Sequence, residues 1–293
     1  MPRLLTGLLL VVSALPLAGQ TRPLKVFVSV DMEGIGGIGT PAMTSSSGKD
    51  YATGRSLMTA EVNAVVATIL AHGPADILVN DSHGDMQNLL HLELDPRVSY
   101  IQGSIKPYGM VQGLDSTFDA VIFVGYHARA GTRDGFIAHT GSGAVEGLWL
   151  NGTEVGEGGL NAFYAGAMGV PVLMASGDEA FGREIRALVP GIHTVATKRA
   201  VGSMVAVLVH PDSVRARLRE AVDSALAGRS RAKAVAASGP VTVRLRFDTT
   251  TRADIVEVIP GVRRVDGTTV EWQAPSMREA YSLVRLMYRY VSW

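Results

Sequence analysis

Apolar positions along the chain follow two kinds of pattern, which predict strands and helices in alternation. Short apolar runs bounded by turn-forming residues predict buried strands at 25–30, 76–79, 97–101, 119–124 and 170–175. Apolar residues at helical spacing predict helices at 51–72 and 157–168. Between them, 147–151 and 153–155 predict a hairpin about Asn151-Gly152. This order predicts an α/β fold with a largely parallel sheet flanked by helices.

The pattern changes near residue 195. Beyond it we predict a strand at 203–209, an arginine-rich amphipathic helix at 212–227 and a linker of small residues at 232–239. Two strands at 241–247 and 268–273 and a final helix at 276–290 follow. We interpret residues 24–195 as a first α/β domain that carries the candidate site described below. Residues 196–293 are predicted to form a second, smaller α/β C-terminal domain.

The N-terminal segment has the layout of a secretory signal peptide. Arg3 gives it a basic start, and the almost wholly apolar run that follows, residues 4–17, is short for a membrane-spanning helix. We expect residues 1–20 to be removed and the protein to be exported, either to the periplasm or outside the cell. A membrane-anchored N-terminus is the alternative.

Charge and cysteine content limit the classes of function. The sequence has 27 Lys and Arg residues against 27 Asp and Glu residues, so its formal net charge is zero. That balance offers no global basic field for nucleic acid or an anionic membrane, and neither is expected as a partner. There is no cysteine, which excludes disulfides and thiolate zinc sites. A metal ion would have to be held by His, Asp and Glu.

Side chains that bind metals stand where predicted strands end. Asp31 and Glu33 follow the first strand, and His83 and His127 follow two later ones. Glu157 begins a helix after the hairpin. Because parallel strands open on one edge of a sheet, these groups can converge there. Two imidazoles and three carboxylates suit Zn²⁺, and they are enough for two ions with one bridging carboxylate.

Each of these residues also has a simpler interpretation. Asp31 could cap the turn that follows its strand, and a single His after a strand is often a hydrogen-bonded loop residue. Gly34, Gly36 and Gly39 satisfy the G-x-G-x-x-G dinucleotide pattern. However, Pro41 and a serine run follow where a helix should begin, and Asp31 and Glu33 would repel a pyrophosphate. The glycines are therefore predicted to form a tight loop over the site.

Several motifs occur in a recognisable order. They are Ser29-x-Asp31-x-Glu33-Gly34, Val79-Asn80-Asp81-Ser82-His83, Gly125-Tyr126-His127-Ala128-Arg129, His139, and Val155-Gly156-Glu157-x-Gly159-Leu160-Asn161-Ala162. In this combination they resemble the D-aminopeptidase family, peptidase family M55, and the resemblance runs from Lys25 to the C-terminus. It implies a di-zinc aminopeptidase acting on short peptides with N-terminal D-residues, such as D-Ala-D-Ala.

The resemblance also implies roles for individual residues. Asp31 would bridge two zinc ions. Glu33 and His83 would hold one ion, and His127 and Glu157 the other. His139 would be catalytic, with a third metal ligand or a core histidine as its alternatives. The family resemblance further implies a homo-oligomer, a decameric ring whose sites line an internal chamber.

The chemistry of such a site agrees with peptide hydrolysis. A water shared by two zinc ions is acidified towards a pKa of about 7 and becomes a hydroxide that attacks the peptide carbonyl. The group that binds the substrate amine is not identified; Glu154 and Asp81 are candidates. Two other functions stay open: an exported peptide-binding or transport-associated protein without metal, and a two-metal amidase or phosphoesterase on the same ligands.

Overall fold

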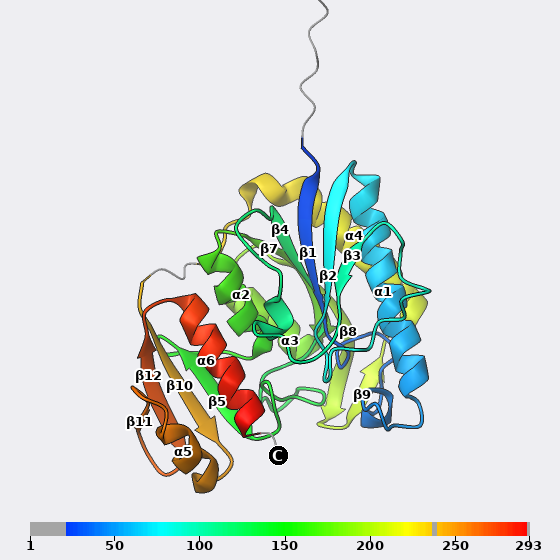
Figure 1. The fold of residues 1–293 in the computed structure, drawn as a ribbon. Helices are drawn as coiled ribbons and strands as arrows, with labels where there is room; N and C mark the ends of the chain where they lie inside the picture. Colours follow the sequence, from blue (N-terminus) through cyan, green and yellow to red (C-terminus); the bar gives the residue numbers. More distant parts are fainter. Residues whose placement is uncertain (1–21, 236–238, 292–293) are drawn as a thin grey trace, which may run out of the picture.

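A seven-stranded sheet forms the larger part of the fold (Figure 1). The computed structural model describes residues 22–235 and 239–291; the predicted signal segment lies outside these residues, as do residues 236–238 of the predicted linker. In spatial order the strands are β3 (Ser99–Ile101), β2 (Ala75–Asp81), β1 (Leu24–Val30), β4 (Ala120–Tyr126), β7 (Val172–Asp178), β8 (His193–Gly202) and β9 (Val205–Leu208). All neighbours pair in parallel except β8 and β9, so the predicted fold class is confirmed.

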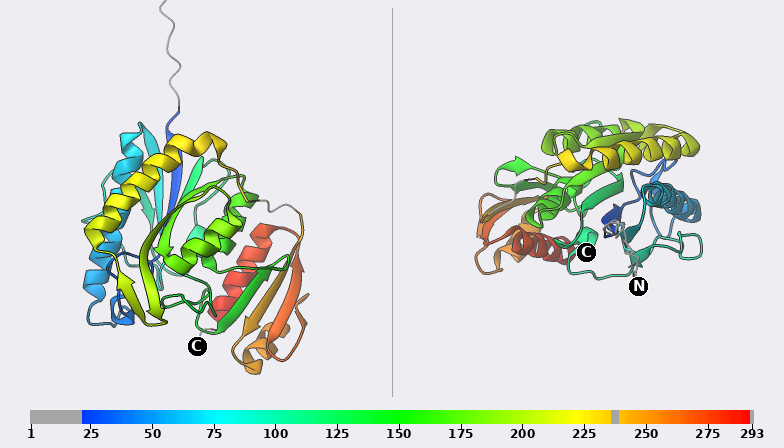
Figure 2. Two further views of the ribbon diagram at one scale, coloured as in Figure 1. Left: turned by 180° about the vertical axis from the view of Figure 1, so that it is seen from behind. Right: turned by 90° about the horizontal axis from the view of Figure 1, so that it is seen from above.

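Successive side chains of each central strand point to opposite faces of this sheet, and both faces are covered. On β1, Val26, Val28 and Val30 join an apolar core with helices α1 (Tyr51–Ala71) and α4 (Pro211–Gly228). Phe27 joins a second core with α2 (Glu157–Ala167) and α3 (Glu179–Leu188). Figure 2 shows α4 running across the face opposite α2. This two-sided burial explains why the first strand reads as a continuous apolar run.

A second, five-stranded sheet is antiparallel and lies beside the first (Figures 1 and 2). Its strands, in spatial order, are β11 (Arg263–Arg264), β12 (Thr269–Ala274), β10 (Val241–Phe247), β5 (Val145–Leu150) and β6 (Thr153–Glu154). Helices α5 (Thr250–Glu257) and α6 (Met277–Tyr290) bury their apolar faces against it, and α6 also contacts α2. Short 3₁₀ turns occur at Pro41–Met43, Gly109–Val111 and Arg229–Arg231.

The two sheets exchange segments across the boundary predicted at residue 195. Strand β8 spans that position, and β9 and α4 continue the first sheet and its helical layer rather than a C-terminal domain. Conversely, the β5–β6 hairpin from the first half pairs with β10. Composition could not reveal this exchange, because it depends on which strand edges meet. Helices α3 and α5 and strand β8 were also not predicted.

No helix within residues 22–235 and 239–291 combines the length and the apolar character needed to cross a bilayer.

Glu61 of α1 is a buried carboxyl group outside the candidate site. Its Oε1 accepts a hydrogen bond from Gly36 N at 2.6 Å, and its Oε2 has no hydrogen-bond partner among the described residues. Burial raises the pKa of Glu61 from its ordinary value of 4.5 to about 7. Between pH 4.5 and pH 7 the folded protein keeps the proton on Glu61, whereas the unfolded chain releases it. The contribution of this protonated group to the free energy of unfolding is therefore complete below pH 4.5 and is lost as the pH rises through 7.

Glu61→Gln should remove this titration while keeping an acceptor for Gly36. We expect the free energy of unfolding of the variant to rise, relative to wild type, by about 3 kcal/mol between pH 4.5 and 8. Urea unfolding at the two pH values measures the difference, in which titrations common to both proteins cancel. Glu220→Gln, at an exposed position of α4, is the control. A difference for Glu61→Gln that does not change with pH would contradict the prediction.

Candidate metal centre

The candidate site lies where the strand order of the first sheet reverses. Strand β1 pairs with β2 on one side and with β4 on the other, and Val30 lies opposite both Asp81 and Val124. The chain therefore leaves all three strands at the same edge. Ligands of doubly wound sheets bind at the carboxyl ends of the strands at such a switch point. The register itself thus brings Asp31, His83 and His127 together.

The loop after β1 is held very close to β4. A Cβ atom on Gly34 would lie 1.8 Å from the carbonyl oxygen of Tyr126, and one on Gly125, whose φ is +72°, would lie 2.4 Å from the carbonyl oxygen of Asp31. Only glycine allows this approach. The motif glycines Gly34, Gly36 and Gly39 are followed only by the 3₁₀ turn Pro41–Met43, and the first α-helix, α1, starts at Tyr51. Their function here is backbone packing, which agrees with the predicted tight loop.

Strand β8 anchors the same loop from the other side. Thr197 Oγ1 donates to Gly34 O at 2.6 Å, and the buried Lys198 Nζ donates to the backbone carbonyls of Glu33 and Ile38. Burial lowers the pKa of Lys198 to about 7. These two side chains fix the segment that carries Glu33. Sequence analysis missed them because β8 shows no pattern that sets Lys198 apart from other lysines.

The first three-residue group consists of Asp31, Glu33 and His83, all buried. His83 Nδ1 lies 3.2 Å from Asp31 Oδ1 and 2.9 Å from Glu33 Oε2. Its other ring nitrogen, Nε2, is positioned to donate to Thr44 O at 2.8 Å. Asp31 Oδ1 also accepts from Met32 N at 2.9 Å. The group therefore places two carboxylates around one free imidazole nitrogen.

The second group consists of His127, His139 and Glu157. His127 Nε2 lies 3.4 Å from both Glu157 Oε2 and Asp31 Oδ2, so Asp31 reaches both groups. His139 Nε2 lies 3.6 Å from Glu157 Oε1, and its ring stacks on His127 at a centroid distance of 4.1 Å. Glu157 is the first residue of α2, and Gly141 N donates to its Oε1 at 2.5 Å.

All three histidines are oriented in the same way by the backbone. His127 Nδ1 faces Ala128 O, and His139 Nδ1 faces Ile137 O, each at 2.9 Å, as His83 Nε2 faces Thr44 O. A ring nitrogen that donates to a carbonyl leaves its partner nitrogen with a free lone pair. In each case that partner nitrogen points at the carboxylates. Protein metal sites hold their imidazole ligands in this manner.

The buried carboxylates make the site strongly favourable for positive charge. Burial and the neighbouring Glu33 raise the pKa of Asp31 to about 7. Burial also disfavours the charged forms of Glu33 and Glu157, but the neighbouring histidines have the larger effect. His83 lowers the pKa of Glu33 well below its ordinary value, and His127 lowers that of Glu157 to about 2. In return, the carboxylates hold the pKa of both histidines well above its ordinary value despite burial. A bound cation would be stabilised in the same way.

The donor atoms fit a metal ion such as zinc. Asp31 Oδ2, Glu33 Oε2 and His127 Nε2 are buried and make no well-aligned hydrogen bond among the described residues, although each lies within 3.4 Å of an ion-pair partner. Buried polar atoms are normally satisfied, so such a cluster suits a bound cation. Imidazole nitrogen and carboxylate oxygen are zinc donors, and the atoms of each group lie within 4.8 Å of one another. The structure thus brings together all six side chains that the sequence analysis singled out.

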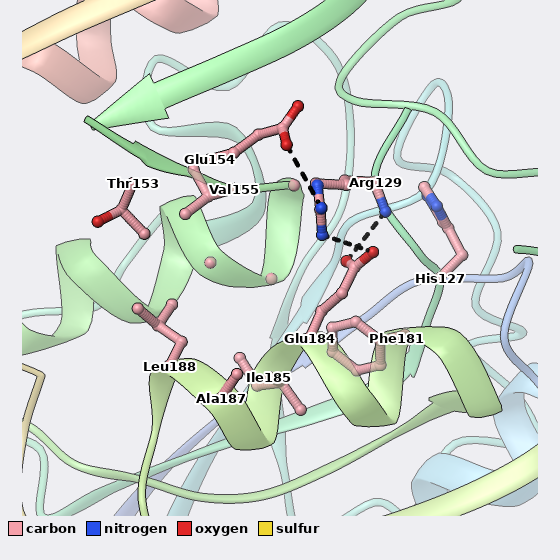
Figure 3. A pocket seen from close by; sticks show the side chains of 13 residues that line it. His127, Arg129, Thr153, Glu154, Val155, Phe181, Glu184, Ile185, Ala187 and Leu188 are labelled. Atoms are coloured by element: carbon pink, nitrogen blue, oxygen red, sulfur yellow. Dashed lines mark hydrogen bonds and ion pairs between the residues drawn. The ribbon is translucent and has the colours of Figure 1, made fainter. Parts of the chain in front are cut away.

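The two candidates for binding the substrate amine are occupied elsewhere. The buried Asp81 accepts hydrogen bonds from Asn88 N, Asn88 Nδ2, Leu89 N and Gln102 Nε2, which makes it a structural anchor. Glu154 lines a different cavity of about 170 Å³ (Figure 3). There Arg129 lies between Glu154 and Glu184, at 3.4 and 2.9 Å, so both carboxylates face a cation. His127 also lines that cavity, but Glu154 is paired there with Arg129.

A buried network behind the site connects four elements. Ser29 Oγ lies 2.6 Å from Tyr126 OH, Asn161 Nδ2 donates to Tyr126 OH at 3.0 Å, and Tyr281 OH donates to Asn161 Oδ1 at 2.8 Å. It links β1 and β4 to α2 and α6. Ser29 and Asn161 belong to the sequence motifs, whereas Tyr281 could not be connected to them from the sequence.

Comparison with known proteins agrees with this geometry. The family model described as D-aminopeptidase, Peptidase M55, matches residues 24–286. A D-aminopeptidase of Bacillus subtilis (strain 168) is 36% identical over 265 residues, which cover 90% of this chain and 96% of the relative. The solved structure of the "Zn-dependent D-aminopeptidase DppA from Bacillus subtilis, a self-compartmentalizing protease" has a TM-score of 0.89 at 36% identity and covers 91% of this chain and 97% of its own. The resemblance seen in the motifs is confirmed, and this chain belongs to the D-aminopeptidase family of peptidases.

Proposed function

We propose that the protein is a zinc-dependent aminopeptidase that hydrolyses short peptides, with a preference for an N-terminal D-residue. The observation that carries the proposal is the common orientation of His83, His127 and His139 around shared carboxylates. The zinc dependence rests on the name given to the solved structure, and the D-residue preference on the names that both relatives carry. The family supplies the reaction class, peptide hydrolysis.

The donor set supports two zinc ions in each chain. We assign Glu33 and His83 to one ion and His127 and Glu157 to the other. Asp31 is assigned to both, because its two carboxylate oxygens face the two different histidines at 3.2 and 3.4 Å. Zinc bound here would polarise the substrate carbonyl and lower the pKa of a water molecule to about 7.

His139 lies outside both ligand sets in this assignment. Its Nδ1 donates to Ile137 O, which leaves Nε2 to exchange a proton in the cavity, and 30% of its side chain is exposed. We infer that this nitrogen takes a proton from the attacking water, then donates the resulting N–H to the oxygen that becomes negative, and finally passes the proton to the leaving amine. These roles act mainly in the transition state.

Metal content and substrate range test the proposal together. Protein purified without added zinc should contain two zinc ions per chain and hydrolyse D-Ala-D-Ala faster than L-Ala-L-Ala. Dipicolinate should remove the activity, and added zinc should restore it. Protein that binds peptides but contains no metal would favour the peptide-binding alternative. Turnover of simple amides or phosphate esters in place of peptides would favour the other two-metal hydrolases.

Assembly and export complete the proposal. The β8–β9 hairpin exposes Val201, Met204, Val205 and Val207, each at more than half of its surface, at an edge of the large sheet. Such a patch suits contact with a second copy of the chain, as in a self-compartmentalizing relative. We propose a homo-oligomer, a decameric ring, exported after removal of residues 1–20. Light scattering measures the assembly, and a monomer would contradict the proposed ring. N-terminal sequencing of the same preparation tests the removal of residues 1–20, and an intact Met1 would contradict it.

A further inference from the structure

Helix α6 contributes a cation to the cavity that contains the metal-binding groups. This cavity of about 180 Å³ is lined by Asp31, Glu33, His83, His139 and Glu157 and, from α6, by Tyr281, Arg285 and Tyr288. The helix comes from the C-terminal part of the chain, more than 100 residues after Glu157. Tyr281 OH fixes it in place through its hydrogen bond to Asn161 of α2, the helix that begins with Glu157.

The guanidinium of Arg285 has no anionic partner in the described part of the chain. It makes no hydrogen bond or ion pair there, and its Nε is buried and unpartnered. Lys106, a buried cation nearby, donates instead to Asn80 Oδ1, Asp81 O and Ile101 O. Arg285 is only partly buried, but leaving the buried Nε of a charged group without a partner is costly. An unpaired guanidinium that lines a substrate cavity therefore points to an anionic ligand.

The position of Arg285 is set by its packing on Gly109. A Cβ atom on Gly109 would lie 2.4 Å from Arg285 Nε and 2.7 Å from Cζ, and Gly109 has a φ of +41°. The guanidinium thus packs against the bare backbone of Gly109, in space that a side chain at that position would fill. A planar cation held in this way can bind a carboxylate through two parallel hydrogen bonds.

We propose that Arg285 binds the C-terminal carboxylate of the peptide substrate, so that the enzyme selects short peptides with a free C-terminus. The inference rests on the proposed aminopeptidase function. In a short peptide without acidic side chains, that carboxylate is the sole anion. A cavity of about 180 Å³ is smaller than the 300–1,000 Å³ typical of drug-sized ligands. In so small a cavity, a cation at the wall can reach the C-terminal carboxylate only when that carboxylate lies close to the scissile bond, so binding to Arg285 limits the length of the peptide.

The test compares three substrates: D-Ala-D-Ala, its C-terminal amide, and D-alanine p-nitroanilide, which has no carboxylate. Wild type should prefer the free dipeptide to its amide. Arg285→Met should lower kcat/KM for the dipeptide by about 30-fold or more, mainly through KM, because it removes ground-state binding of a charge. Turnover of the amide and of the anilide should change by less than about 3-fold, since neither loses that partner.

Two variants and one measurement control the experiment. Arg289→Met removes an exposed arginine of the same helix, whose hydrogen bond goes to Ser104 Oγ, and should leave all three substrates unaffected. Arg285→Lys should recover part of the dipeptide activity, since lysine restores charge but not the two-pronged geometry. Light scattering checks that Arg285→Met keeps the wild-type assembly.

The outcomes separate this inference from the proposed function. An Arg285→Met variant that loses all three substrates equally would make Arg285 a structural residue, and one that keeps the dipeptide would show that it does not bind the carboxylate. A changed assembly would place Arg285 at a subunit contact. Each of these results overturns the inference while wild type still hydrolyses D-alanine p-nitroanilide. Zinc-loaded wild type that hydrolyses none of the three would instead overturn the proposed function.

Discussion

Asp31→Ala is expected to lose both metal ions together and with them essentially all peptidase activity. The two oxygens of this carboxylate face different histidines, His83 at 3.2 Å and His127 at 3.4 Å, so the residue belongs to both three-residue groups. Replacing residues that merely orient a ligand typically weakens metal binding by 10–100-fold, and a shared ligand should cost more than about 100-fold at each ion. Metal analysis after dialysis against a zinc buffer gives both occupancies.

His83→Ala is the matched comparison, because His83 faces the carboxylates of Asp31 and Glu33 and none of the second group. It should weaken one ion and leave the other near its wild-type occupancy. Asp31→Asn keeps the shape of the side chain and tests whether its charge is needed. Two zinc ions retained in Asp31→Ala would show that the carboxylate is not shared and that the two groups bind independently.

His139→Ala should keep both zinc ions and the fold while kcat falls by about 10²–10³-fold, with little change in KM. This is the usual magnitude for losing one donor to a developing oxyanion. The structure supports a role in proton transfer because Ile137 O holds Nδ1 and the ring stacks on His127 with Nε2 facing the cavity. Steady-state kinetics with D-Ala-D-Ala and metal analysis of the same sample measure the two effects.

The alternative for His139 is a ligand role, since its Nε2 lies 3.6 Å from Glu157 Oε1 within the second group. Loss of a zinc ion from the variant would establish that alternative. Wild-type turnover with both ions present would exclude a catalytic role. His91→Ala, which removes an exposed histidine stacked on Tyr100, should behave as wild type in both measurements.

The position of the site could be predicted from the sequence because strand polarity determines it. Asp31, Glu33, His83 and His127 each follow an apolar run, and parallel strands bring such positions to one edge of a sheet whatever the loops do. The ends of the longest helices also follow from local pattern to within one residue, as for Tyr51–Ala71, predicted at 51–72. The assignments of bridging and catalytic roles came from the family resemblance, and they remain predictions for the variants above.

Assignment of segments to sheets could not be predicted in the same way. Residues 145–154 and 193–208 each pair with a sheet that composition assigned to the other half of the chain. Strand pairing depends on which edges are exposed when the core closes. A local pattern describes how a strand is buried but does not identify its neighbours.

The sequence by itself determined the α/β class, the sheet edge that carries the site and five of the side chains gathered there, because periodicity and strand polarity act locally. The sixth, His139, was singled out only by the family resemblance. Only the tertiary structure decided that Lys198 holds the loop of Glu33, that Asp81 accepts four hydrogen bonds from nearby loops, and that Arg285 enters the cavity. The contacts of Lys198 and Arg285 join segments more than 100 residues apart. Long-range contacts of this kind are set by packing of the whole chain, and no local pattern encodes them.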